Sequence, residues 1–94
     1  MARKRAHIIY EGTVQGVGFR WTVEEIAHSV GVVGWVQNRP EGTVEVVCEG
    51  EERDIDALIN RVKQQMQRYI RSVKVEWEAP RGEFDTFRLK FFGG

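Results

Sequence analysis

At residues 14–20 the chain reads Val14-Gln15-Gly16-Val17-Gly18-Phe19-Arg20, and the rest of the sequence is organised around this junction. An extended apolar run ends before it, and a helical pattern begins at its end. Glycine adopts backbone conformations that are closed to other residues, so Gly16 and Gly18 predict a tight loop between a strand and a helix. The amides of such a loop and of the first helical turn have no intrahelical acceptor, and they can converge on an anion.

Arg20 stands in the first turn of this helix, which is the unfavourable end for a cation in the field of the helix dipole. A bound anion would remove the conflict, because a guanidinium group matches phosphate or carboxylate through two parallel hydrogen bonds. The junction therefore predicts an anion cradle, best suited to phosphate. The alternative, on spacing alone, is that the two glycines only form a turn and that Arg20 is solvated.

Length and composition limit the class of protein. The 94 residues allow one domain, expected to span residues 1–94, and a hydrophobic content of 41% is typical of a folded core. No apolar run reaches the length of about 18 residues that a membrane span needs. The basic N-terminus leads into a strand pattern without the apolar stretch of a signal peptide, so a cytoplasmic location is expected. The net charge of zero argues against a nucleic-acid-binding domain.

The titratable residues outside the junction have simple structural interpretations. Cys48 is the only cysteine, which excludes an intrachain disulfide and a thiolate metal cluster, and its spacing in a strand pattern predicts a core residue. His7 is expected to be an exposed strand residue. His28 follows Glu24 by four residues and Glu25 by three, so it is expected to be their surface partner on a helix. We expect neither a metal nor a cofactor.

The remaining pattern predicts an α+β fold. Hydrophobic periodicity gives strands at 6–11, 33–37, 43–49, 73–78 and 87–91 and helices at 19–30 and 52–68. Gly31 ends the first helix, and the turn residues 39–42 join a hairpin. This order is the ferredoxin-like βαββαβ arrangement, with two helices on one face of a four- to five-stranded, mostly antiparallel sheet. The other face is expected to be partly open, which suits strands with a charged second face.

Residues 12–20, together with Gly34-Trp35-Val36-Gln37-Asn38 and Gly42-Thr43-Val44-Glu45, closely resemble the acylphosphatase family. The resemblance covers roughly residues 6 to 50 well and the remainder loosely. It implies hydrolysis of the carboxyl-phosphate anhydride of small acyl phosphates, without a metal. It also implies that Arg20 binds the substrate phosphate, that the amides of the loop from Gln15 to Phe19 support it, and that Asn38 orients the attacking water. The hydroxyl of Thr43 is then expected to support Asn38 and the loop.

Two segments depart from the family pattern. The segment 67–72 replaces a usual Gly-Pro pair, which puts the end of the second helix and the geometry of that loop in doubt. Glu41 stands where the family often has Asp. Of the three tryptophans, Trp35 and Trp77 are expected to pack on the sheet, whereas Trp21 either shapes the entrance to the site or covers the start of the helix.

Two other functions use the same fold. A non-catalytic module would bind an anionic metabolite or partner through the cradle and Arg20, and Asn38 distinguishes the two because only hydrolysis needs a positioned water. An RNA-binding module would need stacking aromatics on its central strands, and residues 43–48 offer none. The expected partner is therefore a small-molecule acyl phosphate, with no nucleic acid and no membrane, and the protein is expected to be a monomer.

Overall fold

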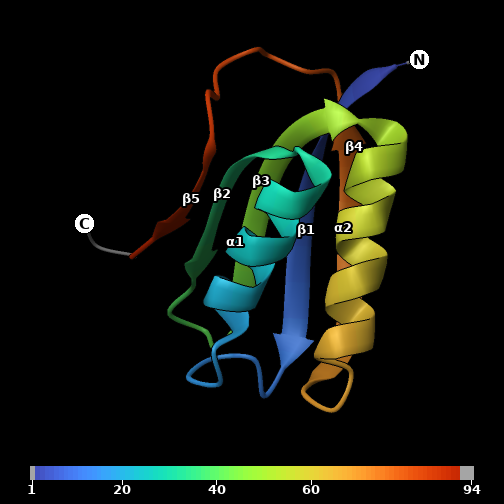
Figure 1. The fold of residues 1–94 in the computed structure, drawn as a ribbon. Coiled ribbons are helices and arrows are strands. Elements are labelled where there is room, and N and C mark those ends of the chain that lie inside the picture. The colour runs from blue at the N-terminus through green and yellow to red at the C-terminus, as the bar shows by residue number, and fades with distance from the viewer. Residues whose placement is uncertain (1, 92–94) are drawn as a thin grey trace.

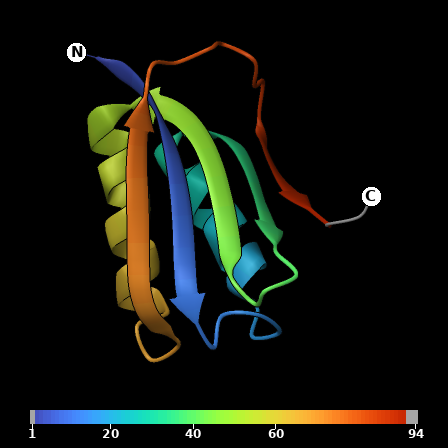
Figure 2. The ribbon, with the colours of Figure 1, turned by 180° about the vertical axis from the view of Figure 1, so that it is seen from behind.

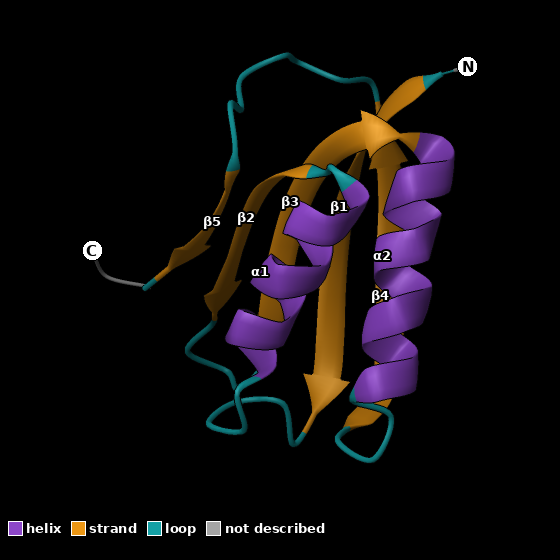
Figure 3. Cartoon of the chain, in the orientation of Figure 1, coloured by secondary structure: helices purple, strands orange, loops and turns teal. Residues whose placement is uncertain are grey.

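In the computed structural model, which describes residues 2–91, two helices cover one face of a five-stranded sheet (Figures 1 and 3). The elements are β1 (Arg3–Gly12), α1 (Phe19–Val30), β2 (Val33–Asn38), β3 (Val44–Glu51), α2 (Glu52–Gln65), β4 (Ile70–Glu78) and β5 (Phe87–Lys90). The strand order is β4-β1-β3-β2-β5. Only the β2–β5 pair is parallel. The predicted α+β, ferredoxin-like fold is confirmed.

The core lies between the sheet and the helices. On β1 the alternate residues Ala6, Ile8 and Tyr10 are fully buried, and they pair in register with Cys48, Val46 and Val44 of β3. The apolar stripes of α1 and α2 cover them, since helical spacing puts every third or fourth residue on one side. Cys48 is a core residue as predicted, and burial raises the pKa of its thiol to about 12.

Glycine defines both ends of α1. Gly18 (φ 77°) precedes the helix, and Gly31 (φ 79°) ends it in the left-handed conformation with its amide on the carbonyl of Ala27. The predicted bounds of this helix are confirmed. The second helix ends at Gln65, three residues earlier than predicted, because residues 66–69 form a turn in which the amide of Tyr69 bonds the carbonyl of Met66. β4 then begins at Ile70, before the predicted start at residue 73.

The face of the sheet away from the helices, seen in Figure 2, carries charged residues in contact. Arg5 Nη1 lies 2.8 Å from Glu49 Oε2, and both side chains are buried. The amides of Arg81 (2.8 Å) and Gly82 (3.0 Å) also donate to Glu49, which anchors the segment between β4 and β5 on this face. His7, expected to be exposed, is half-buried here, with Nε2 2.6 Å from Glu45. The reason is that charged neighbours on β3 and β4 enclose it.

β5 is held from two sides. It pairs with β2, and the side chains of α1 bond its backbone: Glu24 accepts the amide of Leu89 (3.2 Å), and His28 Nε2 lies 3.0 Å from the carbonyl of Phe87. The partner of His28 is therefore the backbone of β5, because a strand lies beside α1 where the sequence pattern showed only the helix's own Glu24 and Glu25. Neither helix in the described part of the chain is long and apolar enough to cross a membrane.

Candidate active site

Two loops meet at one edge of the sheet, beside the start of α1. β1 and β2 run in the same direction with β3 between them, so the loop at residues 13–18 and the turn at residues 39–43 follow strand ends at the same edge. Figures 1 and 2 show both segments there, close to the first turn of α1. Although β3 separates the two strands in the sheet, the loops that follow them converge.

The glycine loop has a backbone that other residues rarely adopt. Gly16 has φ 78° and Gly18 has φ 77°, whereas a Cβ atom added at either position would meet nothing within 4 Å. The backbone conformation, and not crowding, therefore requires glycine at both positions. No side chain in the described part of the chain caps the start of α1, and no acidic residue lies in the first turn of this helix. The first amides of the helix are thus available as donors to an anion.

The side chain of Gln15 fastens this loop to the β2–β3 turn. Its Nε2 atom donates to two carbonyls of the turn, those of Arg39 (2.7 Å) and Thr43 (2.9 Å). From the sequence, Gln15 was expected to contribute only its backbone amide to the loop. No sequence signal identified this second role, because the two acceptors lie 24 and 28 residues away along the chain.

Arg20 leaves the first turn of α1 towards the end of β5. Its Nη1 atom donates to the carbonyl of Lys90 (3.1 Å), and its guanidinium carbon lies 4.8 Å from the centre of the Phe91 ring. These contacts hold the arginine over the mouth of the loop while leaving other N–H groups of its five free for an anion. The sequence analysis missed the contribution of β5, which lies 70 residues away in the chain.

Asn38 is the last residue of β2, and its side chain reaches the same place. Its Oδ1 atom is buried, and among the residues that the structure describes it has no hydrogen-bond partner. A buried acceptor without a partner is rare and calls for an explanation, which a water molecule or a substrate would supply. A cleft of about 140 Å³ joins Asn38 to Arg20 and the loop; its lining is Val14, Gly16, Gly18, Phe19, Arg20, Trp21, Asn38 and Leu89.

Thr43 contributes through its backbone. Its carbonyl accepts both the amide of Arg39 (2.9 Å) and the side chain of Gln15, whereas its hydroxyl donates to Glu41 (3.1 Å). The expected support of Asn38 by the Thr43 hydroxyl is thus replaced by support from its carbonyl to the loop, because the side chain points to Glu41.

Glu45 braces the turn from the open face of the sheet. It lies 3.0 Å from Arg39 Nη1, accepts a hydrogen bond from Gln37 (2.9 Å) and contacts His7. Burial alone would raise the pKa of Glu45, but the hydrogen bonds from Gln37 and His7 and the charge of Arg39 outweigh it and hold that pKa below its usual range. A charged Glu45 therefore holds Arg39, whose carbonyl bonds Gln15.

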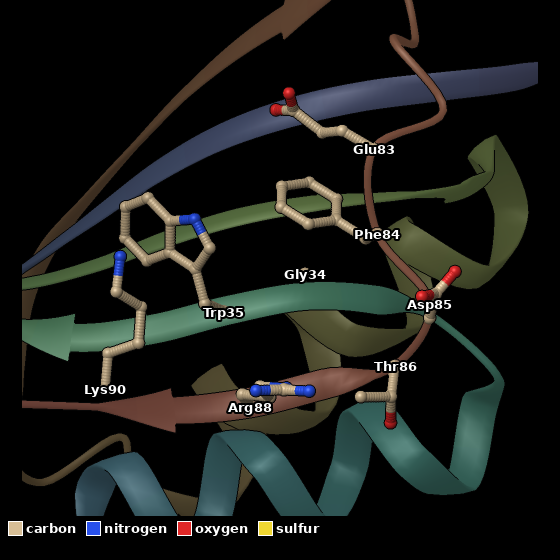
Figure 4. A pocket seen from close by; sticks show the side chains of 8 residues that line it. All are labelled: Gly34, Trp35, Glu83, Phe84, Asp85, Thr86, Arg88 and Lys90. Atoms are coloured by element: carbon tan, nitrogen blue, oxygen red, sulfur yellow. The ribbon is translucent and has the colours of Figure 1, made fainter.

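A second cleft, of about 180 Å³, lies between β2, β5 and the segment that precedes β5 (Figure 4). Trp35 projects into it from β2, and Lys90 Nζ lies 4.4 Å from the centre of its indole ring. Trp35 thus packs on the open face, while Trp77, on β4, is 43% exposed. Neither Arg20 nor Asn38 lines this cleft. Within residues 2–91, no group of three or more His, Cys, Asp or Glu side chains is placed to hold a metal ion.

The family model and the sequence relatives indicate one family. Residues 6–89 match the family model described as Acylphosphatase. A protein of Thermococcus kodakarensis named Acylphosphatase is 49% identical over 84 residues, which cover 87% of this chain and 91% of that protein. An Acylphosphatase of Pelotomaculum thermopropionicum is 40% identical, covering 97% of this chain and all of the other. The crystal structure of acylphosphatase from Bacillus subtilis superposes with a TM-score of 0.85 at 29% identity, covering 93% of this chain and 98% of that one.

Proposed function

The chain belongs to the acylphosphatase family, and on this premise we propose that it hydrolyses acyl phosphates in the cleft between the glycine loop and Asn38. The observation that carries the proposal is that Arg20 borders one cleft with the buried Oδ1 atom of Asn38, at the start of α1. Residues 2–91 supply neither a hydrogen-bond partner for that atom nor a side-chain cap for the helix. A cation and free amides would bind the phosphate, and an acceptor beside them would bind the water that attacks it.

In the proposed reaction the phosphoryl oxygens accept hydrogen bonds from the amides of residues 15–19 and from Arg20. A water molecule donates one hydrogen to Asn38 Oδ1, which directs a lone pair of the water oxygen at phosphorus. The new P–O bond forms as the bond from phosphorus to the acyl oxygen breaks, and the bonding electrons leave with the carboxylate. The proton of the water passes to a phosphoryl oxygen, so the products are a carboxylate and dihydrogen phosphate. The reaction thus relies on positioning and on charge stabilisation.

The absence of a general acid from this scheme follows from the leaving group. A carboxylate is a stable anion, so its departure needs no proton, and the phosphoryl group itself accepts the proton of the water. Among the described residues that line the cleft, Arg20 alone is charged. This lining suits a reaction that needs charge stabilisation at the phosphoryl oxygens and no ionisable side chain for proton transfer.

We further propose that residues 1–94 form one domain that acts as a monomer in the cytoplasm, on a small acyl phosphate and without nucleic acid. Pairing of β1 with β3 and of β5 with β2 in one sheet supports a single domain. The net charge of zero supports the absence of a nucleic-acid partner.

The test is hydrolysis of benzoyl phosphate, with EDTA present, by the wild type, Arg20→Ala and Asn38→Ala. Removing one stabilising donor costs on the order of 10²- to 10³-fold in rate, and we expect losses of that size in both variants. Arg20→Ala should also raise KM, because the arginine contacts the bound substrate, whereas Asn38→Ala should mainly lower kcat. The matched controls are Arg88→Ala, at an exposed arginine of β5, and Gln64→Ala, at an exposed glutamine of α2.

The alternative, a non-catalytic module, gives a different pattern. It predicts no turnover by the wild type, together with binding of inorganic phosphate that Arg20→Ala abolishes and Asn38→Ala leaves in place. That result would overturn the proposal of hydrolysis.

A further inference from the structure

Trp21 is an exposed aromatic residue without a structural reason to be exposed. It follows Arg20 in the first turn of α1 and is 60% exposed, whereas the apolar stripe of the same helix, from Phe19 to Ala27, is buried against the sheet. Its indole borders the same cleft as Arg20 and Asn38. A large apolar surface left in water beside a binding site is typical of a surface that a ligand covers.

Trp21 is not the only apolar residue with accessible surface at the cleft. The half-buried Leu89 also lines it, and the exposed Phe91 stacks on the guanidinium of Arg20. The cradle and Arg20 account for the phosphoryl half of an acyl phosphate. The acyl half must then lie outside the cradle, where the lining is apolar.

The charges around the cleft disfavour an acyl group that carries a negative charge of its own. Arg20 is the only charged residue among the described residues of the lining, and the phosphate would engage it. The nearby Lys90 directs its ammonium to Trp35 in the other cleft, 4.4 Å from the ring centre. Glu24, which accepts the amide of Leu89, adds a negative charge beside the lining. A second anionic group on the substrate would therefore find no cation and one carboxylate.

We propose that Trp21 and Leu89 form a binding surface for the acyl group, and that the protein prefers acyl phosphates with an uncharged aromatic acyl group. This inference rests on the proposed function for the identity of the ligand. Stacking between aromatic groups contributes about 0.5–1.5 kcal/mol beyond area burial, which corresponds to a factor of roughly 2 to 12 in affinity or in kcat/KM.

The test compares phosphonates that cannot be hydrolysed, by calorimetry, with EDTA present. Benzylphosphonate should bind the wild type about three- to tenfold more tightly than methylphosphonate, and 2-carboxyethylphosphonate should bind most weakly. Trp21→Ala should remove the preference for benzylphosphonate, and Trp21→Phe, which keeps an aromatic face, should retain most of it. Trp77→Ala is the matched control, because Trp77 is also partly exposed but lies on β4, the edge strand opposite β5.

The ratio of kcat/KM for benzoyl phosphate to that for acetyl phosphate, measured on the same variants, should change in parallel. The proposal is overturned if the wild type shows no preference for benzylphosphonate, or if Trp21→Ala keeps that preference. Failure of hydrolysis is a separate outcome: a preference that depends on Trp21, without turnover of either acyl phosphate, would leave the aromatic surface in place and refute the enzymatic function.

Discussion

Replacing Gln15 by alanine tests whether the glycine loop is positioned from the β2–β3 turn. The change removes two hydrogen bonds, of 2.7 and 2.9 Å, to the carbonyls of Arg39 and Thr43. Both carbonyls keep a backbone partner, because that of Arg39 accepts the amide of Gly42 and that of Thr43 accepts the amide of Arg39. No acceptor is left without a bond, so the loss should be only that of two ordinary hydrogen bonds, about 1–3 kcal/mol in the free energy of unfolding.

The effect on catalysis should be similar in free energy to the effect on stability, because a tenfold loss in rate corresponds to about 1.4 kcal/mol. Displacement of a reacting group by about 1 Å costs on the order of 10²-fold in rate, so a loosened loop should lower kcat/KM for benzoyl phosphate by about ten- to a hundredfold. The assays are urea unfolding and steady-state kinetics at a temperature where the variant is folded. Gln64→Ala is the matched control, since it makes the same chemical change at an exposed position of α2. Equal kinetics in the two variants would refute the positioning role of Gln15.

Three further predictions concern single residues. Gly18→Ala and Gly31→Ala should each lower the free energy of unfolding in urea by about 1–2 kcal/mol, because both place alanine at φ near +78°, where the added Cβ meets no described atom. Only Gly18→Ala should also lower activity. Equal activities of the two variants would contradict the role of the loop in the site. Tyr10→Phe should raise the free energy of unfolding by about 1 kcal/mol, because the buried Tyr10 hydroxyl has no partner among the described residues, and a loss of stability would show that it has one. Burial alone would raise the pKa of Glu49, but hydrogen bonds from Arg81, Arg5 and Gly82 hold this pKa below its ordinary value. The stability that Glu49 contributes is therefore present above its unfolded-state pKa, and it is lost as the pH falls through its folded-state pKa. Glu49→Gln should therefore make the free energy of unfolding fall less between neutral pH and about pH 3, and an unchanged slope would refute this.

The fold follows from the sequence because its signals are local. Alternation in the strands, the apolar stripe of α1 and the glycines at both of its ends fix those elements without reference to distant residues. The end of α2 was less predictable: Gln65 is followed by a turn that has no glycine and no proline. Its limit is set by the hydrogen bond from Tyr69 to Met66 and by the pairing of β4 with β1, which only the folded chain shows.

The candidate site also contains residues that the sequence could identify and residues that only the structure shows. Arg20, Asn38 and the glycine loop could be named as candidates from the sequence, because the motifs that contain them resemble those of the acylphosphatase family. The residues that hold them in place could not, since Gln15 acts on carbonyls of another loop and Lys90 acts through its own carbonyl. Every residue has a backbone carbonyl, so the amino-acid sequence does not indicate which carbonyls accept these hydrogen bonds.

The hydrogen bond from Arg20 to the carbonyl of Lys90 also has a consequence for the order of events during synthesis. The two residues lie 70 positions apart, and β5, which carries Lys90, is the last strand of the described chain. While a ribosome is still adding residues, β1, α1, β2 and β3 can emerge and associate, but the arginine has no carbonyl to hold it. If Arg20 binds phosphate as proposed, a nascent chain carries its glycine loop well before Arg20 is held in place, and we expect competence for the reaction only once β5 has formed.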